Sequence, residues 1–173
     1  MNKKEYNVGI IGCGKILVRH IEAINSNKNF TLVAVCDTDK ELLKKESTSL
    51  NVPGYEDYKE MVLKEDINFI VVATPNALHF SQAKFCLENG CDVLVEKPAC
   101  LNHELIQEMK KIAKENKQRA YCVLQVRLNP VVSFMKDILE SKILGDIRGV
   151  SLTQRWQRPK EYFNGWRGIP NRS

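Results

Sequence analysis

Glycines near the start of the chain could hold a phosphate. Gly9, Gly12 and Gly14 lie in the segment GIIGCGKIL, which joins an apolar run to a segment with helical spacing. Gly12 permits a tight turn, and Gly14 lets the backbone approach a pyrophosphate, toward which the following helix points its first N–H groups. Leu17 stands where the usual fingerprint has a third glycine. The segment alone is therefore weak evidence for a dinucleotide site.

Asp37 strengthens this interpretation because it ends the next apolar run, FTLVAVC, at the spacing of about 20 residues typical of such sites. A carboxylate there accepts both ribose hydroxyls of an adenosine and repels a 2′-phosphate, which favours NAD over NADP. The pyrophosphate would then lie on residues 12–15, including Lys15, with Ile16 beside it. The alternative is a glycine turn that only packs and an aspartate that caps the next helix.

A Thr-Pro-Asn loop follows the apolar run NFIVVA. Thr74, Pro75 and Asn76 would leave a buried strand at the crevice where open α/β sheets bind ligands. Asn76 suits a ligand contact and a helix cap equally. His79 falls in the first turn of the next helix, where a hydrogen-bonded structural histidine is favoured over a catalytic one.

Glu96-Lys97-Pro98 ends a further apolar run, DVLV. A lysine at the carboxyl end of a strand points its ammonium into the same crevice as the two loops above. Pro98 stiffens the loop. By itself the tripeptide has modest specificity, but its place after the glycine turn and the Thr-Pro-Asn loop makes the combination specific.

The elements that would position these loops alternate between short β-branched runs and segments of helical periodicity. Strands are predicted over 6–11, 30–36, 68–73, 92–96 and 120–126, and helices near 15–25, 40–49, 58–64, 77–89, 102–116 and 130–141. This alternation predicts a doubly wound α/β domain with a parallel sheet over residues 1–144. A half-exposed strand is expected at Ile147–Arg155, within a second, incomplete α+β domain at 145–173.

Composition limits the class of protein. The chain has 173 residues, of which 43% are hydrophobic and 27% charged, values typical of a globular domain rather than of collagen, a coiled coil or a disordered tail. Six scattered cysteines indicate small buried side chains rather than disulfides or a metal site. Without an apolar run of about 18 residues or a signal-peptide pattern, we expect a cytoplasmic protein with no membrane contact.

The net charge of +5 is concentrated near the end of the chain, in residues 154–173. A basic stripe along one element of the main domain is missing, which argues against a nucleic-acid partner. A locally basic surface is the simpler interpretation, and the entrance to a binding site for an anionic ligand is the alternative.

Together these segments resemble the glucose-fructose oxidoreductase / inositol 2-dehydrogenase family (Gfo/Idh/MocA) of NAD(P)-dependent oxidoreductases. The matching segments follow the order of the family and cover nearly the whole chain. They are Gly9–Gly14 with His20, Val35–Asp37, Ala73–Asn76 with His79, Glu96–Pro98, Gln125–Pro130 and Gly165–Gly168.

The resemblance implies an NAD(P)-binding Rossmann domain in which Lys97 is the catalytic lysine, holding the reacting hydroxyl and sharing in proton transfer. It also implies a cis peptide bond before Pro98. The cofactor contacts that it implies beyond the glycine turn and Asp37 are Thr74, Pro75, Asn76, His79, Glu96, Lys97 and Gln125. The substrate contacts that it implies are Lys97, Arg127, Trp166 and Arg167.

Within the family, Gln125–Pro130 and the later Trp-Arg-Gly look most like enzymes that oxidise sugar nucleotides, such as UDP-N-acetylglucosamine or its uronic acid at C3, in polysaccharide synthesis. Family members are usually much longer, and their C-terminal domain supplies an Asp-x-x-x-His element that completes proton transfer. None of His20, His79 and His103 maps onto that element.

The expected function is hydride transfer between a secondary alcohol of a sugar or sugar nucleotide and NAD(P), in a homo-oligomer. The alternative is a truncated dinucleotide-binding module without turnover.

Overall fold

A computed structural model describes residues 5–164 of the chain. The chain divides into two units, the first ending at Val123 and the second beginning at Leu124. The first contains the sheet and the loops discussed above.

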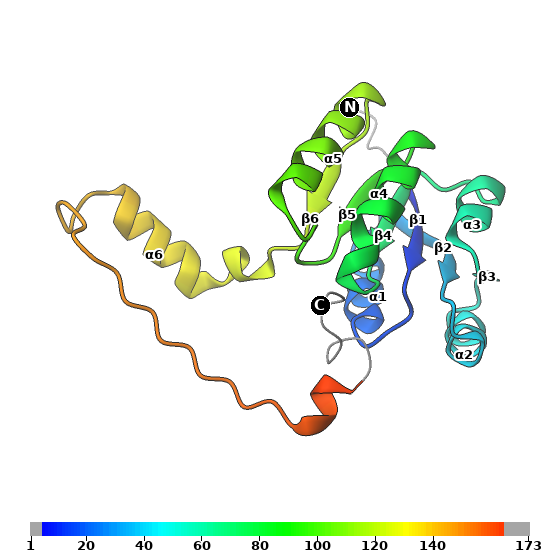
Figure 1. Ribbon diagram of the computed structural model, residues 1–173, viewed down its shortest axis with the longest axis horizontal. Helices are drawn as coiled ribbons and strands as arrows, with labels where there is room; N and C mark the ends of the chain where they lie inside the picture. The colour runs from blue at the N-terminus through cyan, green and yellow to red at the C-terminus, as the bar shows by residue number, and fades with distance from the viewer. Residues whose placement is uncertain (1–4, 165–173) are drawn as a thin grey trace. The chain divides into compact units, whose positions relative to one another are not determined.

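A six-stranded parallel sheet forms the centre of the first unit (Figure 1), in the order β3-β2-β1-β4-β5-β6. Because β1 lies between β2 and β4, the strand order reverses there, and this is where doubly wound sheets bind ligands. The predicted α/β architecture is confirmed. The strands are β1 (Tyr6–Ile11), β2 (Phe30–Cys36), β3 (Gly54–Tyr55), β4 (Phe69–Val72), β5 (Asp92–Val95) and β6 (Ala120–Cys122).

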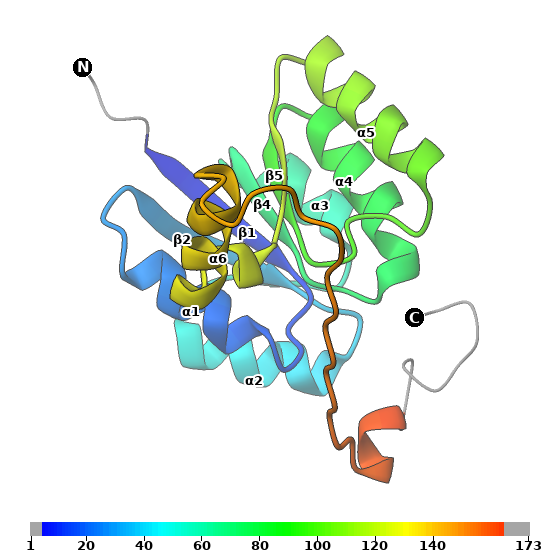
Figure 2. The same ribbon diagram turned by 90° about the vertical axis from the view of Figure 1, so that its left-hand side faces the viewer.

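Helices cover both faces of this sheet (Figure 2). On one face, α1 (Leu17–Asn25) and α2 (Lys40–Leu50) bury Leu17, Ile24 and Leu43 against side chains of β1, β2 and β4. On the other face lie α3 (Tyr58–Lys64), α4 (His79–Glu88) and α5 (His103–Glu115). Since both faces are covered, all four residues of β4, Phe-Ile-Val-Val, are buried.

Short polar side chains fix where several helices begin. Asp39 accepts a hydrogen bond from the Leu42 N–H at the start of α2, and Asn102 accepts one from the Leu105 N–H at the start of α5. Such caps satisfy N–H groups that have no partner inside the helix. They fix where the chain turns from the carboxyl edge of the sheet into each helix.

The second unit consists of two short 3₁₀ turns and one helix in its described part, residues 124–164. The elements are η2 (Gln125–Leu128), α6 (Pro130–Glu140) and η3 (Lys160–Phe163). Asn129 caps α6, and Pro130 occupies its first turn as predicted. No residue of α6 is buried, and its exposed apolar side chains include Val131, Phe134 and Met135.

The structure differs from the predicted elements at three places. Strand β6 ends at Cys122 rather than at 126, because the chain turns into η2. The helix at 130–141, placed in the first domain by the sequence, lies in the second unit. The strand expected over Ile147–Arg155 is not formed, because no other part of the described chain pairs with this segment and a strand needs a partner for its N–H and C=O groups.

The thiols of the first unit behave as small apolar side chains. Five of the six free cysteines are buried, and Cys122 is half-buried. Burial raises the pKa of the Cys13 and Cys36 thiols to about 12. Among the described residues, no group of three or more potential ligands is placed to bind a metal. No described helix is long and apolar enough to cross a membrane.

Candidate active site at the carboxyl edge of the sheet

The glycine turn after β1 has the geometry that its sequence predicts. Gly12 has a φ of +105°, and a Cβ there would lie 2.6 Å from the carbonyl oxygen of Ala73. Its N–H donates to the carbonyl of Cys36 at 2.8 Å. A Cβ on Gly14 would meet no atom within 4 Å. Gly12 is therefore required by the fold, whereas Gly14 leaves its backbone open to a ligand.

Asp37 is bound directly to this turn. One carboxylate oxygen accepts the Cys13 N–H at 2.7 Å, and the other accepts the Asp39 N–H at 2.9 Å. Asp39 caps α2, so the capping alternative for Asp37 does not apply. Each carboxylate oxygen keeps a second lone pair, so Asp37 can still accept from a ribose.

The start of α1 faces the same edge. The Leu17 and Arg19 N–H groups donate to the carbonyls of Gly14 and Ile16, and the other N–H groups of this turn remain for a ligand. No side chain caps this end of the helix, and Lys15 and Ile16 before it are exposed. An anion placed there meets N–H donors and the positive end of the helix dipole. Gly9, in contrast, lies buried inside β1, where a Cβ would stand 2.8 Å from Cδ1 of Ile70. Gly9 therefore occupies a packing position in the sheet.

The loop after β4 is held by two side chains of α4. The Thr74 hydroxyl donates to Gln82 at 2.6 Å, and the Thr74 carbonyl lies 2.8 Å from Nε2 of His79. Asn76 does not cap α4, which has no side-chain cap. This leaves a ligand contact as the open prediction for Asn76.

His79 is completely buried, and both of its ring nitrogens face backbone carbonyls. Its Nδ1 lies 2.8 Å from the carbonyl oxygen of Pro98, and its Nε2 contacts Thr74. This is the geometry of the hydrogen-bonded structural histidine that the sequence favours over a catalytic role. No part of the ring is exposed for contact with a cofactor.

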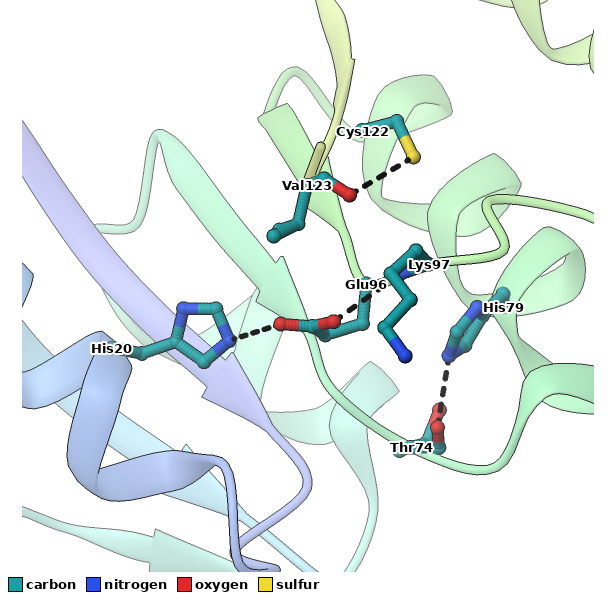
Figure 3. Close-up of polar contacts among 7 residues, drawn as sticks. All are labelled: His20, Thr74, His79, Glu96, Lys97, Cys122 and Val123. Carbon is teal, nitrogen blue, oxygen red and sulfur yellow. Dashed lines mark hydrogen bonds and ion pairs between the residues drawn. The ribbon is translucent and has the colours of Figure 1, made fainter. Parts of the chain in front are cut away.

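Lys97 follows β5 with its side chain exposed at this edge (Figure 3). The peptide bond to Pro98 is cis, as the family resemblance implies. The carboxylate of Glu96 accepts the Lys97 N–H at 3.2 Å and lies 3.1 Å from Nε2 of His20. The His20 hydrogen bond lowers the pKa of Glu96, although partial burial opposes this shift.

Two of the four remaining predicted residues lie in the described part of the second unit. Gln125 and Arg127 are exposed in η2. Trp166 and Arg167 lie outside the described residues. The contacts of these four side chains with cofactor or substrate stay predictions.

A groove of about 550 Å³ lies between α1 and α2 and reaches Gly14 and Lys15 at the glycine turn. Cys13 of the same turn also lines it, and its other lining residues come from the two helices and include Val18, Ile21 and Leu50. None of its lining residues comes from the loops after β4 and β5. The groove therefore reaches this edge only at the glycine turn and does not include Lys97.

The sequence assigned no role to His20. It shares the buried stripe of α1 with Leu17 and Ile24, at helical spacing. A histidine within an apolar stripe signals a buried partner, because buried polar groups are hydrogen-bonded. That partner, Glu96, lies 76 residues away in the sequence, and local patterns could not identify it.

The open Gly14, the uncapped start of α1 and Asp37 fit a dinucleotide, and together they define a dinucleotide-binding Rossmann domain. A family model described as "Oxidoreductase family, NAD-binding Rossmann fold" matches residues 6–124. The chain therefore belongs to the Gfo/Idh/MocA family of oxidoreductases, and its cofactor is NAD.

Relatives of known structure and name extend this assignment. The chain is 30% identical to the WlbA dehydrogenase from Bordetella pertussis, crystallised with NADH and UDP-GlcNAcA, at a TM-score of 0.92 over 98% of this chain and 52% of that one. It is 28% identical to glucose-6-phosphate 3-dehydrogenase from Bacillus subtilis over 84% of this chain and 41% of that protein. It is 27% identical to oxidoreductase P35 from Formosa agariphila over 95% of this chain and 53% of that protein. The chain thus spans about half the length of these relatives.

Proposed function

We propose that the chain is the NAD-binding half of a dehydrogenase that oxidises a secondary alcohol of a sugar nucleotide. The observation that carries this proposal is the placement of Lys97 at the same edge of the sheet as the glycine turn and Asp37. This edge collects the loops after β1, β2, β4 and β5, because all six strands are parallel. A dinucleotide-binding site and the mobile ammonium of Lys97 at one edge of the sheet are suited to hydride transfer.

Each residue of the edge has a defined task in this reaction. Asp37 accepts the ribose hydroxyls of the adenosine, and the N–H groups at the start of α1 bind the pyrophosphate. When bound, NAD supplies the hydride acceptor. Lys97 donates a hydrogen bond to the hydroxyl oxygen of the substrate. It stabilises the negative charge that develops on that oxygen as the hydroxyl proton passes to the histidine of the Asp-x-x-x-His element, which the family resemblance implies for the C-terminal domain.

The sugar-nucleotide substrate is supported by the similarity to the WlbA dehydrogenase, which extends over 98% of the chain and so includes residues after Val123. Arg127, Arg155 and Arg158 give the second unit cationic side chains for a diphosphate or a uronic carboxylate. The similarity to a glucose-6-phosphate 3-dehydrogenase favours oxidation at C3 of the sugar. We place this enzyme in the cytoplasm, as a homo-oligomer without nucleic-acid or membrane partners.

A dinucleotide-binding module without turnover is the second candidate. It is favoured by the exposed apolar side chains of α6, which offer a surface to a second polypeptide. In this case NAD would bind, but no hydride would be transferred until a second polypeptide completed the site.

The test has two stages on the full 173-residue chain. Calorimetric titration with NAD and with NADP measures cofactor binding and preference. Addition of UDP-N-acetylglucosamine or its uronic acid to the NAD complex then measures turnover through NADH absorbance. The Lys97→Met variant should bind NAD within about threefold of wild type and lose at least about a hundredfold in kcat.

Each stage has its own adverse result. Absence of binding heat with both NAD and NADP would contradict a dinucleotide-binding site at this edge. Binding without NADH formation would favour the non-catalytic module. Turnover by Lys97→Met at the wild-type rate would remove Lys97 from the chemistry.

A further inference from the structure

Two buried histidines contact the residues on either side of Lys97, His20 the carboxylate of Glu96 and His79 the backbone carbonyl of Pro98. His20 comes from α1, the helix whose start faces the cofactor edge, and His79 comes from the first turn of α4. The loop between β5 and α5 carries Lys97. Side chains from α1 and α4 therefore contact the loop that carries Lys97.

The first contact runs through Glu96. Nε2 of His20 lies 3.1 Å from Oε1 of Glu96, and the other carboxylate oxygen accepts the Lys97 N–H at 3.2 Å. The side chains of His20 and Glu96 are only 10% and 13% exposed. Because water has little access, this pair is geometrically more constrained than an exposed ion pair.

The second contact involves the residue after the lysine. His79 is 0% exposed, and its Nδ1 lies 2.8 Å from the carbonyl oxygen of Pro98. Its Nε2 lies 2.8 Å from the carbonyl oxygen of Thr74. One ring thus joins the loops after β4 and β5.

The side chain of Lys97 itself remains exposed and lies between Glu96 and His79 in Figure 3. A lysine has a flexible four-carbon stem, and a side chain that must reach a substrate cannot also be anchored to the protein. Its position is then set by the backbone from which it extends. Anchoring the N–H of Lys97 and the carbonyl of Pro98 fixes that backbone on both sides.

We propose that His20 and His79 are positioning residues that hold Lys97 at the cofactor edge, His20 through Glu96 and His79 through the carbonyl of Pro98. The role in catalysis rests on the proposed dehydrogenase function, whereas the geometric role does not. His20 also links the position of Lys97 to α1, the helix that binds the pyrophosphate.

The experiment measures hydrogen exchange at the Lys97 amide by NMR on the ¹⁵N-labelled full chain. His20→Leu and His79→Leu should each speed this exchange by about tenfold relative to the amide of Ile70, as expected for one lost hydrogen bond. His20→Gln keeps one donor for Glu96, and His79→Gln keeps two amide hydrogens for the two carbonyls. Both glutamine variants should stay within about threefold of wild type.

His103→Leu is the matched control, because this third histidine is exposed on α5 and, among residues 5–164, hydrogen-bonds only with Gln107. The Lys97 amide of this variant should exchange hydrogen at the wild-type rate. Equal exchange in the leucine and glutamine variants of both histidines would overturn the proposal, as would unchanged exchange in His20→Leu. If His79→Leu does not fold, two comparisons test the proposal: His79→Gln with wild type, and His20→Leu with His20→Gln.

Cofactor binding separates this inference from the proposed function. The NAD dissociation constants of His20→Gln, His20→Leu and wild type should agree within about threefold, because the glycine turn and Asp37 are untouched. A wild-type chain that does not bind NAD would count against the proposed function while leaving the exchange comparison intact. In an active preparation, His20→Leu should lower kcat more than it changes NAD affinity.

Discussion

Gly12 and Gly14 offer a comparison that separates folding from ligand binding. They lie two positions apart in one turn, yet their surroundings differ. A methyl group on Gly12 would stand 2.6 Å from the carbonyl oxygen of Ala73 and 3.1 Å from the backbone nitrogen of Thr74, at a φ of +105°. A methyl group on Gly14 would enter open space.

The cost of Gly12→Ala follows from these two facts. A left-handed backbone disfavours an L side chain by about 1–2 kcal/mol. The clash is with backbone atoms of the neighbouring loop, which cannot turn away, and overpacking of this kind costs about 1–3 kcal/mol. We expect a loss of about 2–5 kcal/mol in unfolding free energy, which at a slope of about 2 kcal/mol per molar urea lowers the midpoint by about 1–2.5 M.

Gly14→Ala should keep the wild-type unfolding free energy within about 0.5 kcal/mol. The added methyl group stands where a pyrophosphate would approach, so NAD affinity should fall at least about tenfold. Urea unfolding followed by circular dichroism and calorimetric titration with NAD measure the two effects. Equal urea midpoints for the two variants, or undiminished NAD affinity in Gly14→Ala, would refute the division of roles.

Three further predictions concern the charges and thiols of the first unit. Asp37→Ser should weaken NAD binding about tenfold. It should also reduce the ratio of NAD affinity to NADP affinity, because the repulsion of a 2′-phosphate is removed. Titration with both dinucleotides measures this ratio, and an unchanged ratio would contradict the role of Asp37. Since the folded-state pKa of Glu96 is lowered, its carboxylate stabilises the fold above the unfolded-state pKa of about 4.3 and loses this contribution as the pH falls through the folded-state value. Glu96→Gln should therefore cost about 1 kcal/mol at pH 6 and less at pH 3, which urea unfolding at both pH values tests; a cost that grew on acidification would have the wrong sign. With thiol pKa values of about 12, Cys13 and Cys36 should resist a thiol reagent at pH 8 in the folded chain and react fully in urea, as mass spectrometry of labelled peptides would reveal.

The first unit was predictable because its information is local. Buried strands such as Phe-Ile-Val-Val and helices with an apolar stripe are set by short-range patterns, and a parallel sheet then brings every strand's carboxyl end to one edge. This geometry alone predicted that Asp37 would meet the glycine turn, and the hydrogen bond from Cys13 to Asp37 confirms it. The strand Gly54–Tyr55 was missed because a glycine beside a proline signals a turn.

The second unit was less predictable because its elements depend on partners. Val150, Leu152 and Trp156 are 80%, 86% and 65% exposed, although their spacing is typical of one face of a strand. Alternation predicts which face of a strand would be buried, but not whether another strand is present to complete the ladder. The same reasoning applies to α6, whose apolar side chains indicate an amphipathic helix that buries none of its residues.

The site shows a further limit of sequence patterns, which concerns pairs of buried polar groups. His20 and Glu96 each belong to a recognisable segment, but nothing local specifies that they meet. Their contact follows from the strand order, which places β1 beside β4 and β4 beside β5, so that α1 and the loop after β5 approach the same edge. Once they meet, burial makes each residue depend on the other, because replacing either partner leaves the other without its hydrogen bond. The backbone at Lys97 is therefore set by the topology of the whole sheet rather than by the Glu-Lys-Pro tripeptide alone.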